Sequence, residues 1–187
     1  MHAILPQEKN PALRSISKEI PRADIKRAQI QKLIADMKAL LSKEEFGVAL
    51  AAAQVGESVR LFIVSGRALA RGARSAKDEP ESSLKTKNEE LKTIPDQAYI
   101  NPILLKKSRD KINKHEGCLS IRGKWGIVPR AEKATIRALD EHGKEFTRGA
   151  AGFLAHIFQH EMDHLEGILY TDKAVELFDD KSESEAK

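Results

Sequence analysis

Apolar side chains recur at helical spacing in two stretches of the chain. In residues 21–45 they alternate with Lys and Arg, and Gly47 follows as a typical helix-ending residue. In residues 149–165 they cover most of the helix circumference, and Gly167 follows. Because a helix that is apolar on several sides is packed on several sides, the second helix is expected at the centre of the fold.

Short apolar runs and alternating patterns predict strands before and after the second helix. Residues 61–64 are apolar, partly β-branched and bounded by polar residues, which favours a buried strand. Further strands are expected at 97–100, 103–105, 134–139, 144–147 (joined to the preceding strand by a turn at 140–143) and 168–170. Strands clustered around one buried helix indicate an α+β fold, with antiparallel strands packed around the central helix.

Two segments differ in composition from the rest of the chain. Residues 65–95 are rich in charge, Ser, Gly and Pro and poor in large apolar residues, which predicts an exposed loop or insertion with a short helix near 84–91. The tail at 179–187 is polar and is expected to fray. The remaining chain, residues 1–178, is long enough for a single domain with a substantial core.

Composition narrows the class of protein further. With 41% hydrophobic and 32% charged residues, the chain has the balance of a folded domain. No apolar run is long enough to span a bilayer, and the first residues lack the layout of a signal peptide, so we expect a cytoplasmic protein without a membrane partner. The single cysteine, Cys118, excludes an intramolecular disulfide and fits a reducing compartment.

The charge pattern gives little support for nucleic-acid binding. The formal net charge is +4, from 32 Lys and Arg against 28 Asp and Glu, and the two signs are interleaved along the chain. A nucleic-acid surface usually needs a clustered basic patch. No specific nucleic-acid partner is therefore expected.

The clearest chemical signal is an H-E-x-x-H motif at residues 160–164, within the second predicted helix. Residues four apart on a helix share a face, so His160 and His164 can bind one metal ion. Glu161 follows the first histidine and can act as a general base towards a water at that ion. The pattern predicts a metal-dependent hydrolytic site.

A catalytic metal usually has a third protein ligand, and the sequence offers more than one. Glu166 is too close to the motif to reach round the helix, whereas Glu176 is possible. Upstream, Cys118 offers a thiolate, a softer donor that would complete a Cys/His/His site. His156 is excluded as a ligand, because it lies about 12 Å from His164 along a helix axis. It is expected in the core or behind the metal site.

Three motifs occur in order along the chain. Residues 47–54 read GVALAAAQ, residues 116–120 read EGCLS, and residues 159–164 read QHEMDH. In these motifs, and from about residue 13 to 170, the chain resembles the peptide deformylases, which remove the N-formyl group from nascent polypeptides. The resemblance implies hydrolysis of N-formylmethionyl peptides by a metal-activated water.

The resemblance also implies roles for individual residues. Cys118, His160 and His164 would bind one divalent metal ion, most commonly Fe(II), with Zn, Ni or Co also able to occupy the site. Glu161 would act as the general acid and base. The Gln54 side-chain amide and the Leu119 backbone N–H would donate to the developing oxyanion, although Gln54 could instead only cap the turn at 51–53.

The expected substrate contacts are Val48, Ala49, Gly117 and Arg130, although Arg130 could equally be a surface cation. A transient contact with the ribosome is a further implication of the resemblance. Asp163 is expected to hold a neighbouring donor and to take no part in catalysis.

Residue 49 departs from the family motif, which usually has its second Gly there. If the backbone has a positive φ, Ala49 is strained; if φ is negative, its methyl group narrows the substrate cleft. The extended pattern around it favours the second.

Two other functions remain open from the sequence. One is an H-E-x-x-H metallopeptidase that cuts internal bonds, in which the third ligand lies downstream and Cys118 is dispensable. The other is a binding module whose metal is structural, although such sites usually have four protein ligands.

Overall fold

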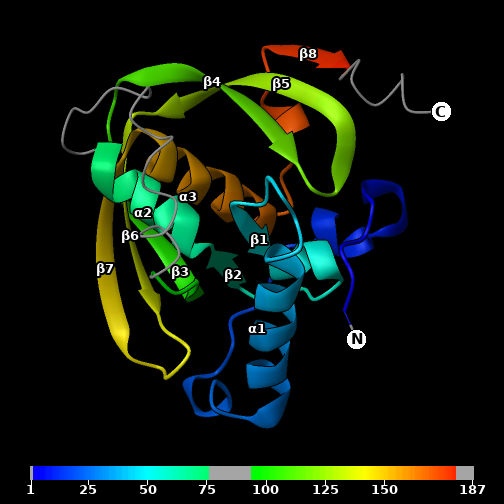
Figure 1. The fold of residues 1–187 in the computed structure, drawn as a ribbon, viewed down its shortest axis with the longest axis vertical. Helices are drawn as coiled ribbons and strands as arrows, with labels where there is room; N and C mark the ends of the chain where they lie inside the picture. Colours follow the sequence, from blue (N-terminus) through cyan, green and yellow to red (C-terminus); the bar gives the residue numbers. More distant parts are fainter. Residues whose placement is uncertain (1, 76–93, 180–187) are drawn as a thin grey trace.

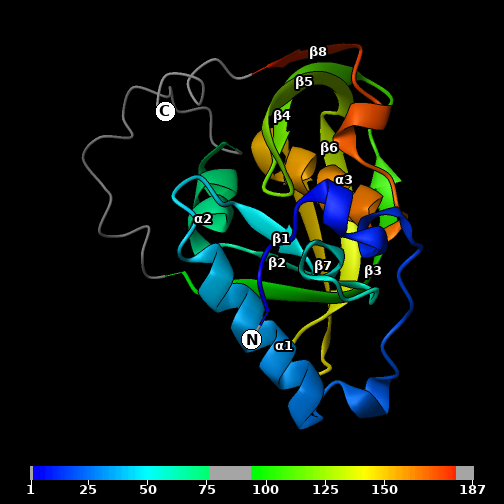
Figure 2. The same cartoon turned by 90° about the vertical axis from the view of Figure 1, so that its right-hand side faces the viewer.

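Two antiparallel sheets and a central helix build the fold in the computed structural model, which describes residues 2–75 and 94–179. The larger sheet has the strand order β1-β2-β3-β6-β7, and the smaller sheet has the order β4-β5-β8. Helix α3 (Gly152–Leu165) contacts β1, β6 and β7 of the larger sheet and β5 of the smaller one (Figures 1 and 2). The predicted α+β fold around the motif-bearing helix is confirmed.

The strands of the larger sheet are β1 (Ala49–Ala51), β2 (Leu61–Val64), β3 (Gln97–Lys107), β6 (Lys133–Leu139) and β7 (Glu145–Ala151). Those of the smaller sheet are β4 (Lys111–Cys118), β5 (Ile121–Ala131) and β8 (Glu176–Asp179). All residues of β2 are buried, as its uninterrupted apolar run predicts. In β6 the alternation puts Ala134, Ile136 and Ala138 in the core.

Helix α1 (Ala28–Leu41) is shorter than the predicted helix at 21–45. Residues Arg22–Asp24 form a separate 3-10 turn, and Arg27 is extended. The Gln31 side chain donates to the carbonyl oxygens of Ile25 and Glu141, both at 2.8 Å, and so fixes a non-helical path before the helix. The apolar face of α1 includes Leu33 and Met37 and packs in the core beside β1 and β2.

The predicted exposed loop at 65–95 is wrong for residues 66–75, which form a helix. Helix α2 (Gly66–Ser75) packs against α3, and Ala68 and Leu69 are buried in the core. A Cβ added at Gly72 would lie 2.6 Å from Leu154, which shows how closely the two helices approach. Residues 76–93 of the predicted insertion, which include its helix near 84–91, lie outside the described residues, as does most of the predicted tail.

Two strand predictions need correction. β3 is one strand with a bulge at Asn101, where φ is +48° and the side chain bonds to both backbone groups of Ile20 (2.8 and 2.7 Å). The predicted strand at 168–170 is wrong, because Tyr170–Asp172 forms a 3-10 turn. The Asp172 carboxylate accepts the Leu169 N–H (2.9 Å) and pairs with Arg14, which favours the turn. The last strand is β8.

None of the helices in the described ranges is both long and apolar enough to cross a membrane.

Candidate active site

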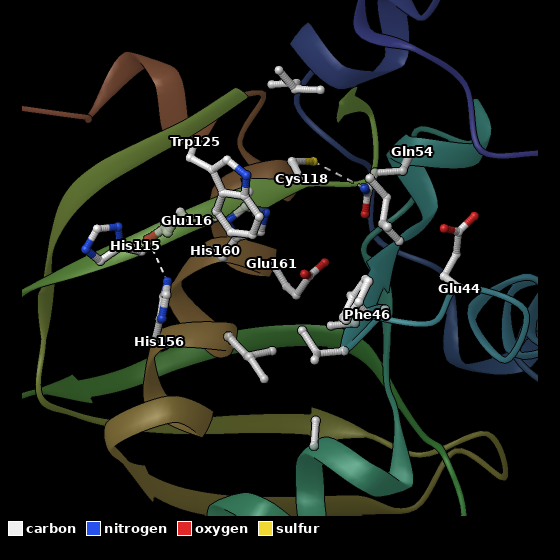
Figure 3. Close-up of a pocket in the computed structure, with 18 of the residues that line it drawn as sticks. Glu44, Phe46, Gln54, His115, Glu116, Cys118, Trp125, His156, His160 and Glu161 are labelled. Atoms are coloured by element: carbon white, nitrogen blue, oxygen red, sulfur yellow. Dashed lines mark hydrogen bonds and ion pairs between the residues drawn. The ribbon is translucent and has the colours of Figure 1, made fainter. Parts of the chain in front are cut away.

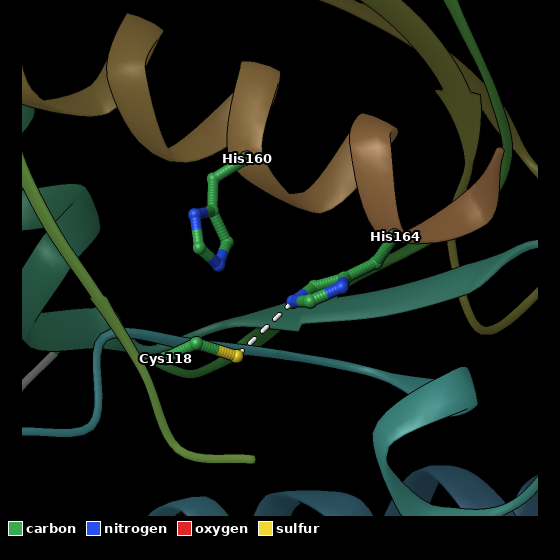
Figure 4. A group of neighbouring side chains, drawn as sticks. All are labelled: Cys118, His160 and His164. Carbon is green, nitrogen blue, oxygen red and sulfur yellow. Dashed lines mark hydrogen bonds between the residues drawn. The ribbon is translucent and has the colours of Figure 1, made fainter. Parts of the chain in front are cut away.

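A cysteine and two histidines from two elements converge on one point. Cys118 ends β4, and His160 and His164 stand one turn apart on α3 (Figure 4). Their ligand atoms all lie within 4.8 Å of one another, and Cys118 Sγ is 3.4 Å from His164 Nε2. The structure therefore brings together the thiolate and the two imidazoles that the motifs suggest.

This donor set fits a divalent transition-metal ion. Ligand atoms about 2.0–2.3 Å from a tetrahedral ion lie roughly 3–4 Å apart, close to the spacing seen here. Burial holds the pKa of His164 well below its usual value, so its ring is neutral and offers a lone pair. The thiolate and imidazole donors suit Fe, Zn, Ni or Co better than Mg or Ca. Glu176, the alternative ligand, is exposed on β8 and does not join this group.

The backbone explains why β4 and α3 meet in this way. Glu116 and Cys118 are two residues apart on a strand and share a face, while His156, His160 and His164 share a face of the helix. Glu116 contacts His156 and His160, and Cys118 contacts His164. Side chains two residues apart at the end of β4 thus meet side chains four residues apart on α3, although the pairing of β4 with β5 shifts register between Glu116 and Cys118.

Glu116 anchors the side chains behind the metal position. Its carboxylate lies 2.8 Å from His160 Nδ1 and 2.8 Å from His156 Nε2, and it accepts two hydrogen bonds from Arg130 (2.5 and 2.9 Å). Although burial opposes ionisation, these three partners hold the pKa of Glu116 well below its usual range. An ionised acceptor at Nδ1 keeps the proton there, so Nε2 of His160 is left to face the metal.

Arg130 is buried against Glu116, on the side of that residue away from the cavity, and does not line the cavity itself. Its guanidinium is buried (4% exposed), bridges Glu116 and Asp163 (2.6 Å), and does not line the cavity. The surface-cation alternative is therefore wrong, and the structure places no Arg130 group where a substrate would lie. Asp163 also accepts from Lys173 (2.6 Å), so its predicted role as a holder of neighbouring donors is confirmed. His156, as expected, is no ligand and bonds to Glu116.

Glu161 is a buried carboxylate that the fold leaves partly unsatisfied. It is 4% exposed, and its Oε2 has no hydrogen-bond partner. Burial is the main cause that raises its pKa to about 7, with nearby Glu116 adding to the effect. A carboxyl group with a pKa near neutrality can both take and return a proton, which is the requirement for a general acid and base. It also lines the cavity, within reach of a bound molecule.

The Gln54 side chain makes hydrogen bonds to both Ala51 and Cys118. Its Oε1 accepts the Ala51 N–H (2.9 Å), which caps the 3-10 turn Ala52–Val55, and its Nε2 donates to Cys118 Sγ (3.4 Å). The sequence suggested that Gln54 either caps this turn or donates to the oxyanion, and the two roles are compatible. The hydrogen bond to Ala51 orients the Gln54 amide N–H group towards the site. Leu119 follows Cys118 in the turn between β4 and β5 and lines the same cavity.

The site opens into a cavity of about 1030 Å³. Figure 3 shows Glu161, Cys118 and Gln54 together on its wall. Val48, Ala49 and Gly117 line it too. Ala49 lies in β1, paired with Val64, and Asn101 alone among the described non-glycine residues has a positive φ. Ala49 is therefore unstrained, and its methyl group lies on the cavity wall.

Sequence reasoning did not assign several residues of this site. Glu116 was recognised from the sequence only as part of the EGCLS motif, without a role. Its role depends on Arg130, His156 and His160, which lie 14 to 44 positions away in the chain. Phe46 and Trp125 also line the cavity. Trp125 is the single tryptophan of the chain, a weak signal that could have drawn attention to it.

Comparisons with known proteins show which family the chain is similar to. The family model described as polypeptide deformylase matches residues 2–179. A peptide deformylase of Symbiobacterium thermophilum is 40% identical over 179 residues, which cover 94% of this chain and 69% of the relative. The crystal structure of a peptide deformylase from Legionella pneumophila has a TM-score of 0.70 and 31% identity, covering 92% of this chain and 85% of that one.

A second solved structure, the Met-Ala-Ser-bound class I type b peptide deformylase from Acinetobacter baumannii, has a TM-score of 0.71 and 28% identity. It covers 92% of this chain and 99% of that one.

Proposed function

The chain belongs to the peptide deformylase family and is an enzyme that removes the N-formyl group from peptides, and we propose that the reaction takes place where Cys118, His160 and His164 meet. The convergence of these three ligand groups beside a partly unsatisfied Glu161 is the observation that carries the proposal. A bound divalent ion would polarise the formyl carbonyl and lower the pKa of an adjacent water towards about 7.

We assign Fe(II) as the physiological ion, with Zn, Ni or Co occupying the site in protein purified in air. The mixed sulfur and nitrogen donors accept all four ions, so availability and protection from oxygen decide which is bound. The single thiolate favours these ions over harder cations. Two imidazoles and one thiolate leave a position for water, as a catalytic site requires.

Glu161 is the group that moves the proton. Its buried, partly unsatisfied carboxylate takes a proton from the attacking water and then delivers it to the departing amine. Burial raises the pKa of Glu161 above that of a free carboxyl group, which makes it a stronger base for the proton of the attacking water. General acid–base catalysis of this kind contributes about 10²–10⁴-fold to a rate.

The developing negative charge on the formyl oxygen is stabilised by two donors. The Gln54 amide already points towards Cys118, held by its bond to Ala51. The Leu119 backbone N–H follows the metal ligand directly in the chain. Losing one such donor typically costs about 2.7–4 kcal/mol of transition-state stabilisation.

The substrate is an N-formylmethionyl peptide whose chain lies along Val48, Ala49 and Gly117 on the cavity wall. The Met-Ala-Ser peptide in the Acinetobacter baumannii relative has the composition of such a product. Arg130 acts on this reaction only through Glu116, because it is buried behind the metal position. We also propose that the enzyme acts on nascent chains in the cytoplasm, in transient contact with the ribosome.

Anaerobic purification followed by metal analysis and a formate-release assay tests the proposal. We expect about one divalent ion per chain and hydrolysis of formyl-Met-Ala-Ser. Activity should disappear with a chelator and return when Fe(II) or Ni(II) is added. Full activity after complete metal removal would overturn the assignment. Cleavage of internal peptide bonds without formate release would favour the metallopeptidase alternative.

A further inference from the structure

The two groups assigned as donors to the formyl oxygen lie in separate turns of the chain. Gln54 belongs to the 3-10 turn Ala52–Val55, which follows β1 of the larger sheet. Leu119 belongs to a two-residue turn between β4 and β5 of the smaller sheet, because Cys118 and Ile121 are paired on either side of it. No backbone hydrogen bond joins these two turns, both of which lie within the described residues. The relative position of the two donors therefore depends on segments that contact both turns.

One such segment is residues 5–13, which we call the N-terminal bridge. The Leu5 N–H donates to the Gln54 carbonyl oxygen, and the Gln7 N–H donates to the Ser120 carbonyl oxygen, each at 2.9 Å. Figure 2 shows this segment, in dark blue, beside the turn that follows β1. Because the two donating groups are only two residues apart, one short piece of chain connects turns that belong to different sheets.

Two buried side chains of the N-terminal bridge hold it in place. Asn10 is 2% exposed, and its Nδ2 donates to the Ala53 carbonyl oxygen at 2.8 Å, while its Oδ1 accepts the Ala12 N–H at 3.2 Å. Leu13 is fully buried in an apolar cluster with Ala53 and Ile121, one residue from each turn. The N-terminal bridge is therefore part of the folded core and contacts both turns with side chains as well as with its backbone.

The accepting carbonyl groups belong to residues that are almost fully buried. Gln54 is 2% exposed and Ser120 is 3% exposed. A buried carbonyl group that loses its donor is unfavourable, so each turn favours the orientation in which its carbonyl faces the N-terminal bridge. Leu119 directly precedes Ser120, and the Gln54 side chain starts from the backbone that Leu5 holds. The bridge therefore affects the direction of both oxyanion donors.

We propose that the N-terminal bridge positions the two oxyanion donors, by holding the turn of Gln54 and the turn of Leu119 at a fixed separation. This inference rests on the proposed function and adds positioning residues to it. Gln7 and Asn10 act through the donors, and neither lines the cavity. Because the donors act on charge that develops in the transition state, a change in their separation lowers kcat and leaves KM nearly unchanged.

The test removes one N–H group from the N-terminal bridge. Gln7 is the first residue of a 3-10 turn, and Pro6 before it is extended (φ −67°, ψ 150°), so proline is compatible with position 7. Gln7→Pro removes the donor to Ser120, whereas Gln7→Ala keeps this N–H and is the matched control. With the metal-loaded enzyme and formyl-Met-Ala-Ser, we expect kcat of Gln7→Pro to fall by roughly 3–30-fold and KM to change by less than about twofold. Gln7→Ala should keep wild-type kinetics.

Asn10→Ala tests the other contact of the N-terminal bridge, because it removes the donor to Ala53, the residue before Gln54. We expect this variant also to lose kcat with little change in KM. Circular dichroism and metal content, measured on the same samples at the assay temperature, show that each variant compared is folded and loaded with metal. A loss of kcat in such samples is then separated from a loss of folded protein.

The outcomes separate the positioning role from the proposed function. Wild-type kcat in folded, metal-loaded Asn10→Ala, or in folded, metal-loaded Gln7→Pro, overturns the positioning role and leaves the proposed function standing. An equal fall in Gln7→Ala and Gln7→Pro, or an effect on KM alone, overturns it as well. If the wild-type enzyme hydrolyses no formyl peptide, the proposed function is overturned and this inference with it.

Discussion

Replacing Arg130 with Met should destabilise the protein far more than an ordinary loss of an ion pair. The guanidinium makes three hydrogen bonds, to Glu116 and Asp163, and both it and Glu116 are almost fully buried. Breaking a buried pair leaves an uncompensated carboxylate and costs about 3–5 kcal/mol. For a chain of this length, that corresponds to a fall in Tm of roughly 6–20 °C.

Arg14→Met is the matched control, because Arg14 also makes a two-pronged pair, with Asp172, but both side chains are well exposed (47% and 38%). An exposed pair contributes about 0–1 kcal/mol, so its loss should move Tm by at most about 4 °C. Thermal unfolding should be followed with metal saturating and again with a chelator present, so that metal binding is separated from folding.

The same substitution should weaken metal binding, since Glu116 loses the partner that holds it against His160. Loss of such a supporting contact typically lowers metal affinity by about 10–100-fold. Competition with a chelator measures this affinity. Equal Tm changes in Arg130→Met and Arg14→Met, with unchanged metal affinity, would refute the reasoning.

Three further substitutions or treatments test other parts of the structure. Leu69→Ala should cost about 2–5 kcal/mol in urea unfolding, because Leu69 is buried against the core, and a change below about 1 kcal/mol would show that α2 is not part of it. Ala49→Gly should lower stability by about 0.5–1 kcal/mol and change KM more than kcat, whereas a more stable variant with unaltered kinetics would contradict the unstrained backbone. The iron form should lose activity in air while the nickel form persists, because the thiolate and Fe(II) are open to oxidation, and equal decay of both forms would count against this cause.

Local patterns predicted the parts of the fold that local geometry determines. The H-E-x-x-H spacing needs only the helical period, so His160 and His164 could be placed on one face from the sequence. The strand β2 could be recognised because its apolar run is short, partly β-branched and bounded by polar residues. These features depend on neighbours within a few residues.

Contacts between distant residues account for most of the differences. The bulge at Asn101 forms because its side chain bonds to Ile20, 81 positions away. The 3-10 turn after Leu169 is favoured by Asp172, which pairs with Arg14 across 158 positions. Helix α2 was read as an exposed loop because it is rich in Arg and Gly, yet Gly72 is what lets it approach Leu154 closely. Contacts between residues this far apart in the chain cannot be predicted from the pattern of neighbouring residues.

In the site, too, some features could be predicted from neighbouring residues and others depend on contacts between distant ones. The motifs pointed to Cys118 and Glu161, but the burial that raises the pKa of Glu161 to about 7 depends on how the two sheets enclose α3. Arg130 was assigned to the substrate or the surface, because its two buried acidic partners are brought to it only by tertiary packing.

The central claim is that Cys118, His160 and His164 hold the metal and that Glu161 moves protons without binding it. The most direct test measures metal content and formate release from formyl-Met-Ala-Ser in the same samples of Glu161→Ala and Cys118→Ala. Glu161→Ala should retain about one ion per chain and lose almost all activity, whereas Cys118→Ala should lose both. Full metal occupancy in Cys118→Ala, or wild-type turnover in Glu161→Ala, would contradict the account.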